Sequence, residues 1–100
     1  MEINIVENSD NILVTLSGSF DTLAAQQTEP QIKELEALAS KSLTLDFSAL
    51  DYIASSGLRM LLRLRKAAAA QGKRITLLHV NDNITEVLRV THLDQMFILQ

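Results

Sequence analysis

The sequence predicts one α/β domain in which a four-stranded, mostly parallel sheet carries helices mainly on one face, in the order β-β-α-β-α-β-α. Apolar residues alternate with polar ones in several short segments, a pattern typical of strands. From the second such segment onward, consecutive segments are separated by longer stretches that carry an apolar stripe at helical spacing. With 100 residues, 47% of them hydrophobic, the chain is large enough for one core and too small for two. Residues 1–100 are therefore expected to form a single domain.

The first two strands are expected to form a hairpin. Ile3 and Ile5 alternate with polar residues, and residues 8–11 are the Asn, Ser and Asp side chains that favour turns. Residues 12–16 form the second strand, which Gly18 is expected to end. The hairpin makes the first strand antiparallel to the second.

A helix in two pieces is expected next. Asp21 or Thr22 can cap its first turn, and Pro30 should interrupt it because proline lacks an N–H and disfavours helical geometry in the residue before it. The second piece carries an apolar stripe that consists of Ile32, Leu35, Leu38 and Ala39. Residues 40–42 close this segment.

Two further strand–helix pairs follow. The third strand carries Leu43, Leu45 and Phe47 on one face, and a long helix runs from about Ser55 to Gln71, where Gly72 should stop it. The fourth strand is expected over residues 74–80, and Asn81 or Asp82 should cap the last helix, whose buried stripe is Ile84, Val87 and Leu88. The apolar tail of Leu93, Met96, Phe97 and Ile98 should pack on the core. Right-handed helical crossovers make strands two to four parallel, and their alternating pattern leaves one sheet face thinly covered.

The long central helix carries much of the positive charge. Six of the nine basic residues lie between Arg59 and Arg74. A helical wheel assigns Leu58, Leu61, Leu62, Ala68 and Ala69 to the sheet side, Arg59, Arg63 and Lys66 to the opposite side, and Met60, Leu64 and Ala67 to the region between, with Arg65 toward the apolar side. The basic strip is either a solvated face or the rim of a docking surface with an apolar centre.

Composition and motifs exclude several classes of function. The chain has no cysteine, no recognised metal-ligand spacing and no phosphate-binding glycine loop, which predicts neither metal nor cofactor. His79 and His92 lie in no catalytic motif, and the apolar neighbours of His79 suggest a structural role, so no enzyme is expected. A net charge of −3 argues against nucleic-acid binding, and no apolar run reaches the length of a membrane span. A cytoplasmic location fits these features.

Ser55 and Ser56 stand where the central helix begins, and two interpretations are open. One serine can cap the helix, an interaction worth about 1 kcal/mol. Alternatively, a hydroxyl at this position can be phosphorylated, because the helix dipole and unpaired N–H groups stabilise a phosphate there. The added charge of about −1.5 to −2 would then repel an acidic or apolar partner.

Three segments resemble a known family. Residues 43–58 (LTLDFSALDYIASSGL) are similar to the central signature of STAS domains, the bacterial anti-sigma factor antagonists. Residues 16–21 (LSGSFD) resemble the strand end that precedes the first helix in this family, and residues 87–97 (VLRVTHLDQMF) resemble its C-terminal pattern. The resemblance covers nearly the whole chain in the right order.

The resemblance implies regulation of transcription by partner switching. An unmodified antagonist of this family binds an anti-sigma factor that is also a serine kinase, and ATP-dependent phosphorylation of the serine at the start of the central helix ends binding until a phosphatase restores it. By position, Ser55 would be phosphorylated, with Ser56 as the adjacent alternative. The residues expected to contact the partner are Asp21, Ala54, Ser55, Ser56, Gly57, Arg59, Met60 and Arg63.

Two positions depart from the family pattern. Ala54 replaces a common aspartate before the modified serine, which removes a charge that a kinase could recognise. His92 stands where glycine is common and is interpreted as a local variation of the turn.

STAS-like chains also serve as accessory subunits of ABC-type lipid transporters, and there the serine supports an interface without modification. A ligand sensor is a third class, for which the sequence contains no pocket motif.

Overall fold

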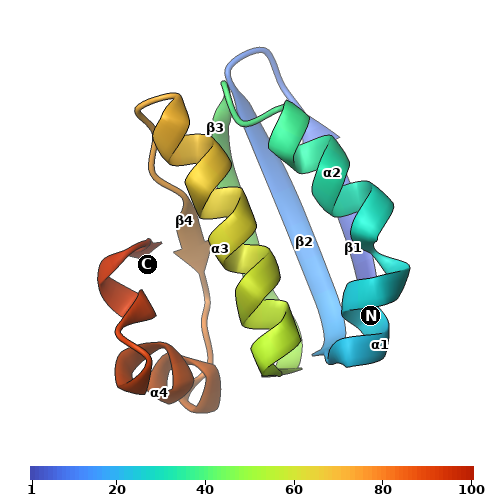
Figure 1. The fold of residues 1–100 in the computed structure, drawn as a ribbon, viewed down its shortest axis with the longest axis vertical. Helices are drawn as coiled ribbons and strands as arrows, with labels where there is room; N and C mark the ends of the chain where they lie inside the picture. The colour runs from blue at the N-terminus through green and yellow to red at the C-terminus, as the bar shows by residue number, and fades with distance from the viewer.

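The computed structural model describes residues 1–100, whose five strands form one mixed sheet in the order β1-β2-β3-β4-β5 (Figure 1). The strands are β1 (Glu2–Glu7), β2 (Asn11–Phe20), β3 (Ser42–Ile53), β4 (Thr76–Leu78) and β5 (Ile98–Leu99). β1 is antiparallel to β2, and every other neighbouring pair is parallel. The predicted α/β class and the directions of the first four strands are confirmed. The predicted strand count is corrected from four to five.

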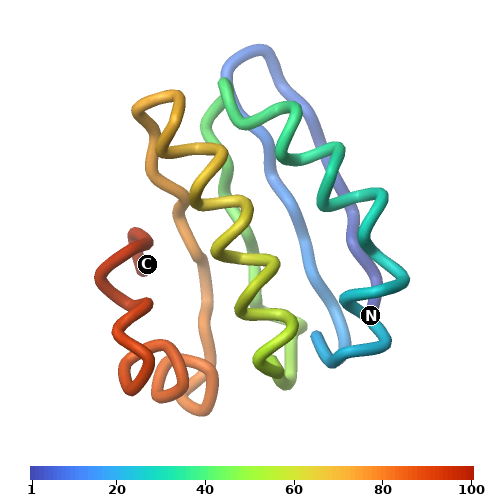
Figure 2. Tube along the Cα trace, in the orientation of Figure 1, coloured from blue at the N-terminus to red at the C-terminus, as the bar shows by residue number.

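The helices gather on one face of the sheet, and Figures 1 and 2 show α3 crossing its middle. They are α1 (Thr22–Gln27), α2 (Glu29–Ala37), α3 (Ser55–Ala70) and α4 (Asp82–Val90), followed by a 3₁₀ turn at Leu93–Gln95. The predicted interruption near Pro30 is confirmed, since α1 ends and α2 begins around Thr28. Pro30 lies in the first turn of α2, where its missing N–H leaves no helical hydrogen bond unmade. None of the helices combines the length and apolar character that a membrane crossing requires.

The core lies between this helical layer and the sheet. The predicted inward faces of β2 and β3 are buried, as is the α2 stripe apart from the half-buried Leu38. The wheel of α3 is corrected: Leu64 belongs to the core, while Arg65 and Ala69 are exposed. α3 packs against α1 and α2 as well as the sheet, so its buried face is wider than the predicted stripe and includes Leu64.

Gly18 does not end β2 as predicted. Its φ of +99° is accommodated within the strand, where the pairing with β3 shifts register between Gly18 and Ser19. The strand therefore continues to Phe20, which is buried, and β3 extends in parallel to Ile53. This extension brings Asp21 and the start of α3 to the same end of the domain.

Two helices stop at residues with left-handed backbone. Gly72 has a φ of +70°, and the N–H groups of Gly72 and Lys73 donate to the carbonyls of Ala69 and Ala68 at 3.0 and 2.9 Å. These bonds complete a Schellman motif after α3 and confirm the predicted stop. His92, with a φ of +61°, follows α4 in the same conformation, which explains why glycine suits this position.

Asparagine and aspartate caps fix the starts of α4 and α1. Asp21 accepts a hydrogen bond from the N–H of Ala24 at 2.8 Å, whereas Asn81 both accepts from Ile84 at 2.8 Å and donates to the carbonyl of Leu50 at 3.1 Å. We expect Asn81→Ala to lower the free energy of unfolding by about 2 kcal/mol and Asp21→Ala by about 1 kcal/mol, because only Asn81 also satisfies a strand carbonyl. Urea denaturation measures both losses, and equal losses would contradict the second role of Asn81.

The sheet face opposite the helices is uncovered and carries an Asp–His pair. His79 Nδ1 lies 3.1 Å from Asp46 Oδ1, and the same oxygen accepts the N–H of Ser48 at 2.9 Å. His79 has a φ of +56° and its side chain is exposed, which corrects the expected apolar surroundings. The pKa of the Asp46 carboxyl is lowered, first by the Ser48 N–H and then by His79.

This lowered pKa predicts acid sensitivity. The ionised Asp46 carboxylate contributes its full stabilisation at neutral pH. This stabilisation is lost as the pH falls from about 4, the ordinary pKa of an aspartate, through the lower pKa that the carboxyl has in the folded protein. Between pH 5 and pH 3, we expect wild type to lose more stability than Asp46→Asn, as measured by thermal unfolding. The control Asp10→Asn, which removes a turn carboxylate without a hydrogen bond, should behave as wild type. Equal losses in wild type and Asp46→Asn would refute the assignment.

Candidate functional site

One end of the domain collects the polar ends of several elements. The carboxyl ends of β2 and β3 lie there, together with the N-termini of α1, α3 and α4, at the lower edge of Figure 1. In open α/β sheets this edge is the usual place for ligands, because helix N–H groups without helical partners point outward there. We call this end the switch pole.

At the switch pole, Ala54 is the N-cap residue of α3, which corrects the expectation that a serine caps the helix. Its extended backbone donates from its N–H to the carbonyl of Phe20 at 2.9 Å, and its carbonyl accepts from Leu58 at 3.0 Å. Its side chain forms no cap. The N–H groups of Ser55, Ser56 and Gly57 precede the first helical hydrogen bond of α3.

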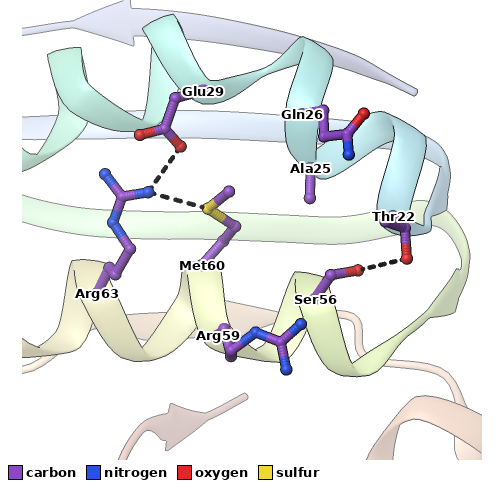
Figure 3. Close-up of a pocket in the computed structure, with 8 residues that line it drawn as sticks. All are labelled: Thr22, Ala25, Gln26, Glu29, Ser56, Arg59, Met60 and Arg63. Atoms are coloured by element: carbon purple, nitrogen blue, oxygen red, sulfur yellow. Dashed lines mark hydrogen bonds and ion pairs between the residues drawn. The ribbon is translucent and has the colours of Figure 1, made fainter.

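The two serines have opposite environments. Ser55 is exposed at the first position of α3. Ser56 is only 8% exposed, and its Oγ lies 3.2 Å from Oγ1 of Thr22 (Figure 3). This hydroxyl pair connects the start of α3 to the start of α1. Ser55 is therefore accessible from solvent, while Ser56 is covered and already hydrogen-bonded.

Gly57 shapes the pole from below the surface. A Cβ atom here would lie 2.8 Å from Ile53 Cγ1, 2.8 Å from the carbonyl oxygen of Phe20 and 2.9 Å from Phe20 Cγ. No side chain fits at these distances, so only glycine lets α3 approach the ends of β2 and β3 this closely. Because Gly57 is buried, it positions Ser55 and does not itself offer a contact surface.

A groove of about 570 Å³ begins at the switch pole and runs between α3 and the α1–α2 pair (Figure 3). Its lining combines hydroxyl, amide, charged and apolar side chains from Thr22, Ala25, Gln26, Glu29, Ser56, Arg59, Met60 and Arg63. Four of the residues predicted to contact a partner thus line one surface feature: Ser56, Arg59, Met60 and Arg63.

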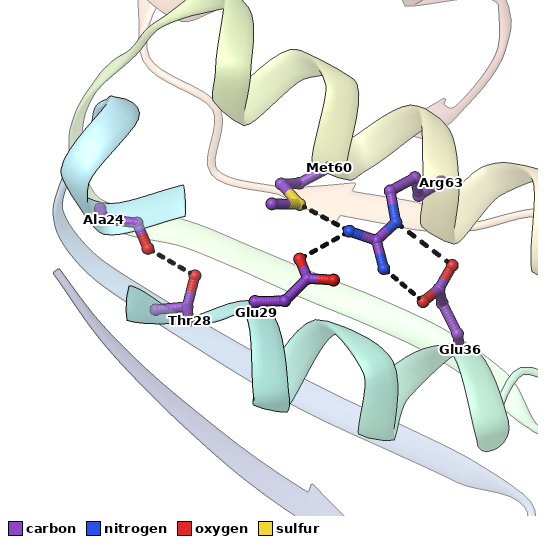
Figure 4. Close-up of polar contacts among 6 residues, drawn as sticks. All are labelled: Ala24, Thr28, Glu29, Glu36, Met60 and Arg63. Atoms are coloured by element: carbon purple, nitrogen blue, oxygen red, sulfur yellow. Dashed lines mark hydrogen bonds and ion pairs between the residues drawn. The ribbon is translucent and has the colours of Figure 1, made fainter. Parts of the chain in front are cut away.

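Arg63 is half-buried and is held against α2 by two carboxylates of that helix (Figure 4). Its Nη1 lies 2.6 Å from Glu29 Oε2, and its Nη2 lies 2.7 Å from Glu36 Oε1. Hydrogen bonds from Arg63 lower the pKa of Glu29, and the two carboxylates raise the pKa of Arg63. A helical wheel of α3 alone could not predict these ion pairs of Arg63 with α2. The seven-residue spacing of Glu29 and Glu36, which places both on one face of α2, was the available signal.

Arg59 differs from Arg63 because it is exposed and belongs to none of the ion pairs. Asp21 is also exposed, and one of its carboxylate oxygens accepts a hydrogen bond from the α1 backbone.

The sequence analysis did not single out two exposed apolar residues: Leu23 is 60% exposed and Tyr52 is 54% exposed, both near the strand ends. Tyr52 borders a second, smaller groove between β3 and α4. The alternation of β3, with Ile53 facing the core, already pointed Tyr52 outward.

The side chains at the switch pole and in the groove offer polar, charged and apolar groups on one surface. Nowhere do three His, Asp or Glu side chains gather as metal ligands. Neither histidine lies at the switch pole next to Ser55: His79 contacts Asp46 on the open sheet face, and His92 follows α4. What the pole presents chemically is one accessible hydroxyl beside unpaired N–H groups, a free guanidinium and exposed apolar side chains.

The chain belongs to the STAS_2 family, whose model, described as "Mlab, STAS domain", matches residues 3–100. A STAS-domain containing protein from Pseudomonas aeruginosa strain UCBPP-PA14 is 26% identical over 99 residues, which cover 97% of each chain. The family resemblance stated from the sequence is confirmed.

Solved structures of anti-sigma factor antagonists share the fold. One from Mycobacterium paratuberculosis superposes with a TM-score of 0.84 at 21% identity and covers 98% of this chain and 83% of that chain. The phosphorylated form of SpoIIAA, a Bacillus cell fate determinant, superposes with a TM-score of 0.75 at 18% identity and covers 99% of this chain and 91% of that chain. These similarities confirm the STAS fold with its mixed sheet and one helical layer.

Proposed function

We propose that this protein is an anti-sigma factor antagonist that binds its partner through the switch pole and is released when Ser55 is phosphorylated. The partner is an anti-sigma factor with serine kinase activity, which transfers the γ-phosphoryl group of ATP to Ser55 Oγ. The new O–P bond forms as ADP leaves, and the hydroxyl proton passes to the kinase. A phosphatase reverses the modification, and the protein itself contributes no catalytic residue and needs no cofactor. The use of ATP places this exchange in the cytoplasm.

The contrast between the two serines carries this proposal. Ser55 is exposed at the first position of α3, whereas Ser56 is 8% exposed and bound to Thr22. A phosphate on Ser55 would be stabilised by the start of α3 without disturbing the core. The phosphate would also add about two negative charges to a surface that contains the exposed Leu23 and Tyr52. This charge would disfavour contact with an apolar partner surface.

The geometry also refines the proposed contact surface. Of the predicted contacts, Asp21, Ala54, Ser55, Arg59 and Met60 are at least partly exposed near the pole or along the groove. Arg63 lines the groove while it is ion-paired with Glu29 and Glu36. Gly57 lies below the surface and allows α3 to pack closely on Phe20 and Ile53. Leu23 and Tyr52 join the surface as apolar anchors, the residue types that interface centres favour.

Ala54 favours a second candidate function. A STAS accessory subunit of an ABC-type lipid transporter would use the same pole as a permanent interface, with Ser55 unmodified. At the N-cap of α3, Ala54 supplies neither a cap hydrogen bond nor the negative charge that is common there in phosphorylated antagonists. This absence leaves the kinase one recognition feature fewer.

Affinity capture followed by a kinase assay separates the two candidates. We expect the unmodified protein to capture a kinase-like ATPase from its own cell extract, and the purified ATPase with ATP to place one phosphate on Ser55, as mapped by mass spectrometry. Phosphate on Ser56 or elsewhere would refute the assignment. Capture of an ATPase–permease complex that leaves Ser55 unmodified would establish the accessory-subunit function instead.

A further inference from the structure

Arg59 is the free cation of the groove and lies one helical turn after Ser55. The other arginine of the groove, Arg63, is bound to Glu29 and Glu36, whereas Arg59 forms no ion pair. Both Ser55 and Arg59 are exposed. The charge of Arg59 is therefore available to a group that arrives at the start of α3.

The helix geometry brings this charge toward position 55. Residues four apart on a helix share one face and are separated by about 6 Å along the axis. Side chains on helices also point back toward the N-terminus, and Figure 3 shows the Arg59 guanidinium extended toward the end of α3 where Ser56 lies. An anion four residues before a cation is the favourable order for such a pair.

We propose that Arg59 is the internal partner of phosphorylated Ser55, an inference that rests on the proposed modification of that serine. In the unmodified protein, its guanidinium is offered to the binding partner along the groove. After phosphorylation, it forms a charge-assisted hydrogen bond to the phosphate. Phosphorylation thus adds negative charge and also withdraws the free cation of the groove from the partner.

The test uses protein with phosphoserine incorporated genetically at position 55, so no kinase is needed. The second ionisation of this phosphate is titrated by ³¹P NMR in wild type and in Arg59→Gln. We expect the midpoint in wild type to lie about 0.3 pH units below that in the variant, because Arg59 stabilises the dianion. Glutamine preserves helix propensity at this exposed position, so the variant should fold.

Arg65→Gln is the matched control. It removes the same charge from an exposed position of α3, but it lies ten residues from Ser55, about 15 Å along the axis. Its midpoint should equal that of wild type, and 1 M salt should reduce the Arg59 effect. Asp21 follows Phe20, whose carbonyl accepts the N–H of Ala54, and Asp51 precedes Ser55 by four residues; both are unchanged throughout, so they do not contribute to the difference.

Equal midpoints in wild type and Arg59→Gln, or equal shifts in both variants, would overturn the pairing. These outcomes are independent of the proposed function, because the phosphate is installed directly. Absence of a kinase for Ser55 would refute the switch and leave the measured pairing intact.

Discussion

Gly57→Ala should lower the free energy of unfolding by about 2 kcal/mol. An added methyl group would lie 2.8 Å from both Ile53 Cγ1 and the carbonyl oxygen of Phe20, and neither the backbone carbonyl nor the buried β3 residue has room to move. Overpacking of this kind costs up to about 3 kcal/mol, against a gain of about 1 kcal/mol in helix propensity. Urea denaturation measures the net loss.

The sign of this change makes the test decisive. Propensity alone predicts that alanine stabilises α3, whereas close packing predicts that it destabilises the domain. Ala69→Gly, the reverse change at an exposed position of the same helix, should cost about 1 kcal/mol and calibrates the propensity term. A Gly57→Ala variant more stable than wild type would show that α3 does not depend on close approach to Phe20.

Local patterns were sufficient for the elements whose signals lie within a few residues. Pro30 divided α1 from α2, Gly72 ended α3, and the alternation of Leu43, Leu45 and Phe47 fixed the buried face of β3. In each case the physical cause is local: a missing N–H, a left-handed backbone, or the two-residue period of a strand.

Long-range pairing produced the features that local patterns missed. β5 has two residues and exists because Ile98 and Gln100 donate their N–H groups to Ile75 and Leu77 at 2.9 and 3.0 Å. No periodicity is visible in two residues. Gly18 likewise looked like a strand end, although pairing with β3 carries β2 through its positive φ.

The candidate site shows the same division. The family motif indicated Ser55, with Ser56 as the alternative, but their different exposure depends on packing against Thr22, 34 residues away from Ser56. The helical wheel predicted that Arg59, Arg63 and Lys66 form one basic strip, but Arg63 is half-buried and ion-paired with α2. The effective charge of the strip depended on Glu29 and Glu36 of another helix, which pair with Arg63 and leave Arg59 and Lys66 as the unpaired cations of the strip.

Ser55→Asp should weaken binding to the captured partner at least tenfold, equivalent to about 1.4 kcal/mol, whereas Ser55→Ala should retain wild-type affinity. The reason is electrostatic: an aspartate places a permanent negative charge at the exposed position 55, whereas alanine removes only a hydroxyl. Isothermal titration calorimetry with the purified partner measures both affinities.

Ser9→Asp separates this local effect from a change in net charge. Ser9 is exposed in the turn between β1 and β2, at the end of the sheet opposite the start of α3 in Figure 1, so the same added charge lies far from the switch pole. Its affinity should match that of wild type, since exposed charges separated by more than about 10 Å are largely screened at moderate salt. If Ser9→Asp weakened binding as much as Ser55→Asp, the partner would respond to overall charge, and the position of Ser55 at the start of α3 would have no part in the switch.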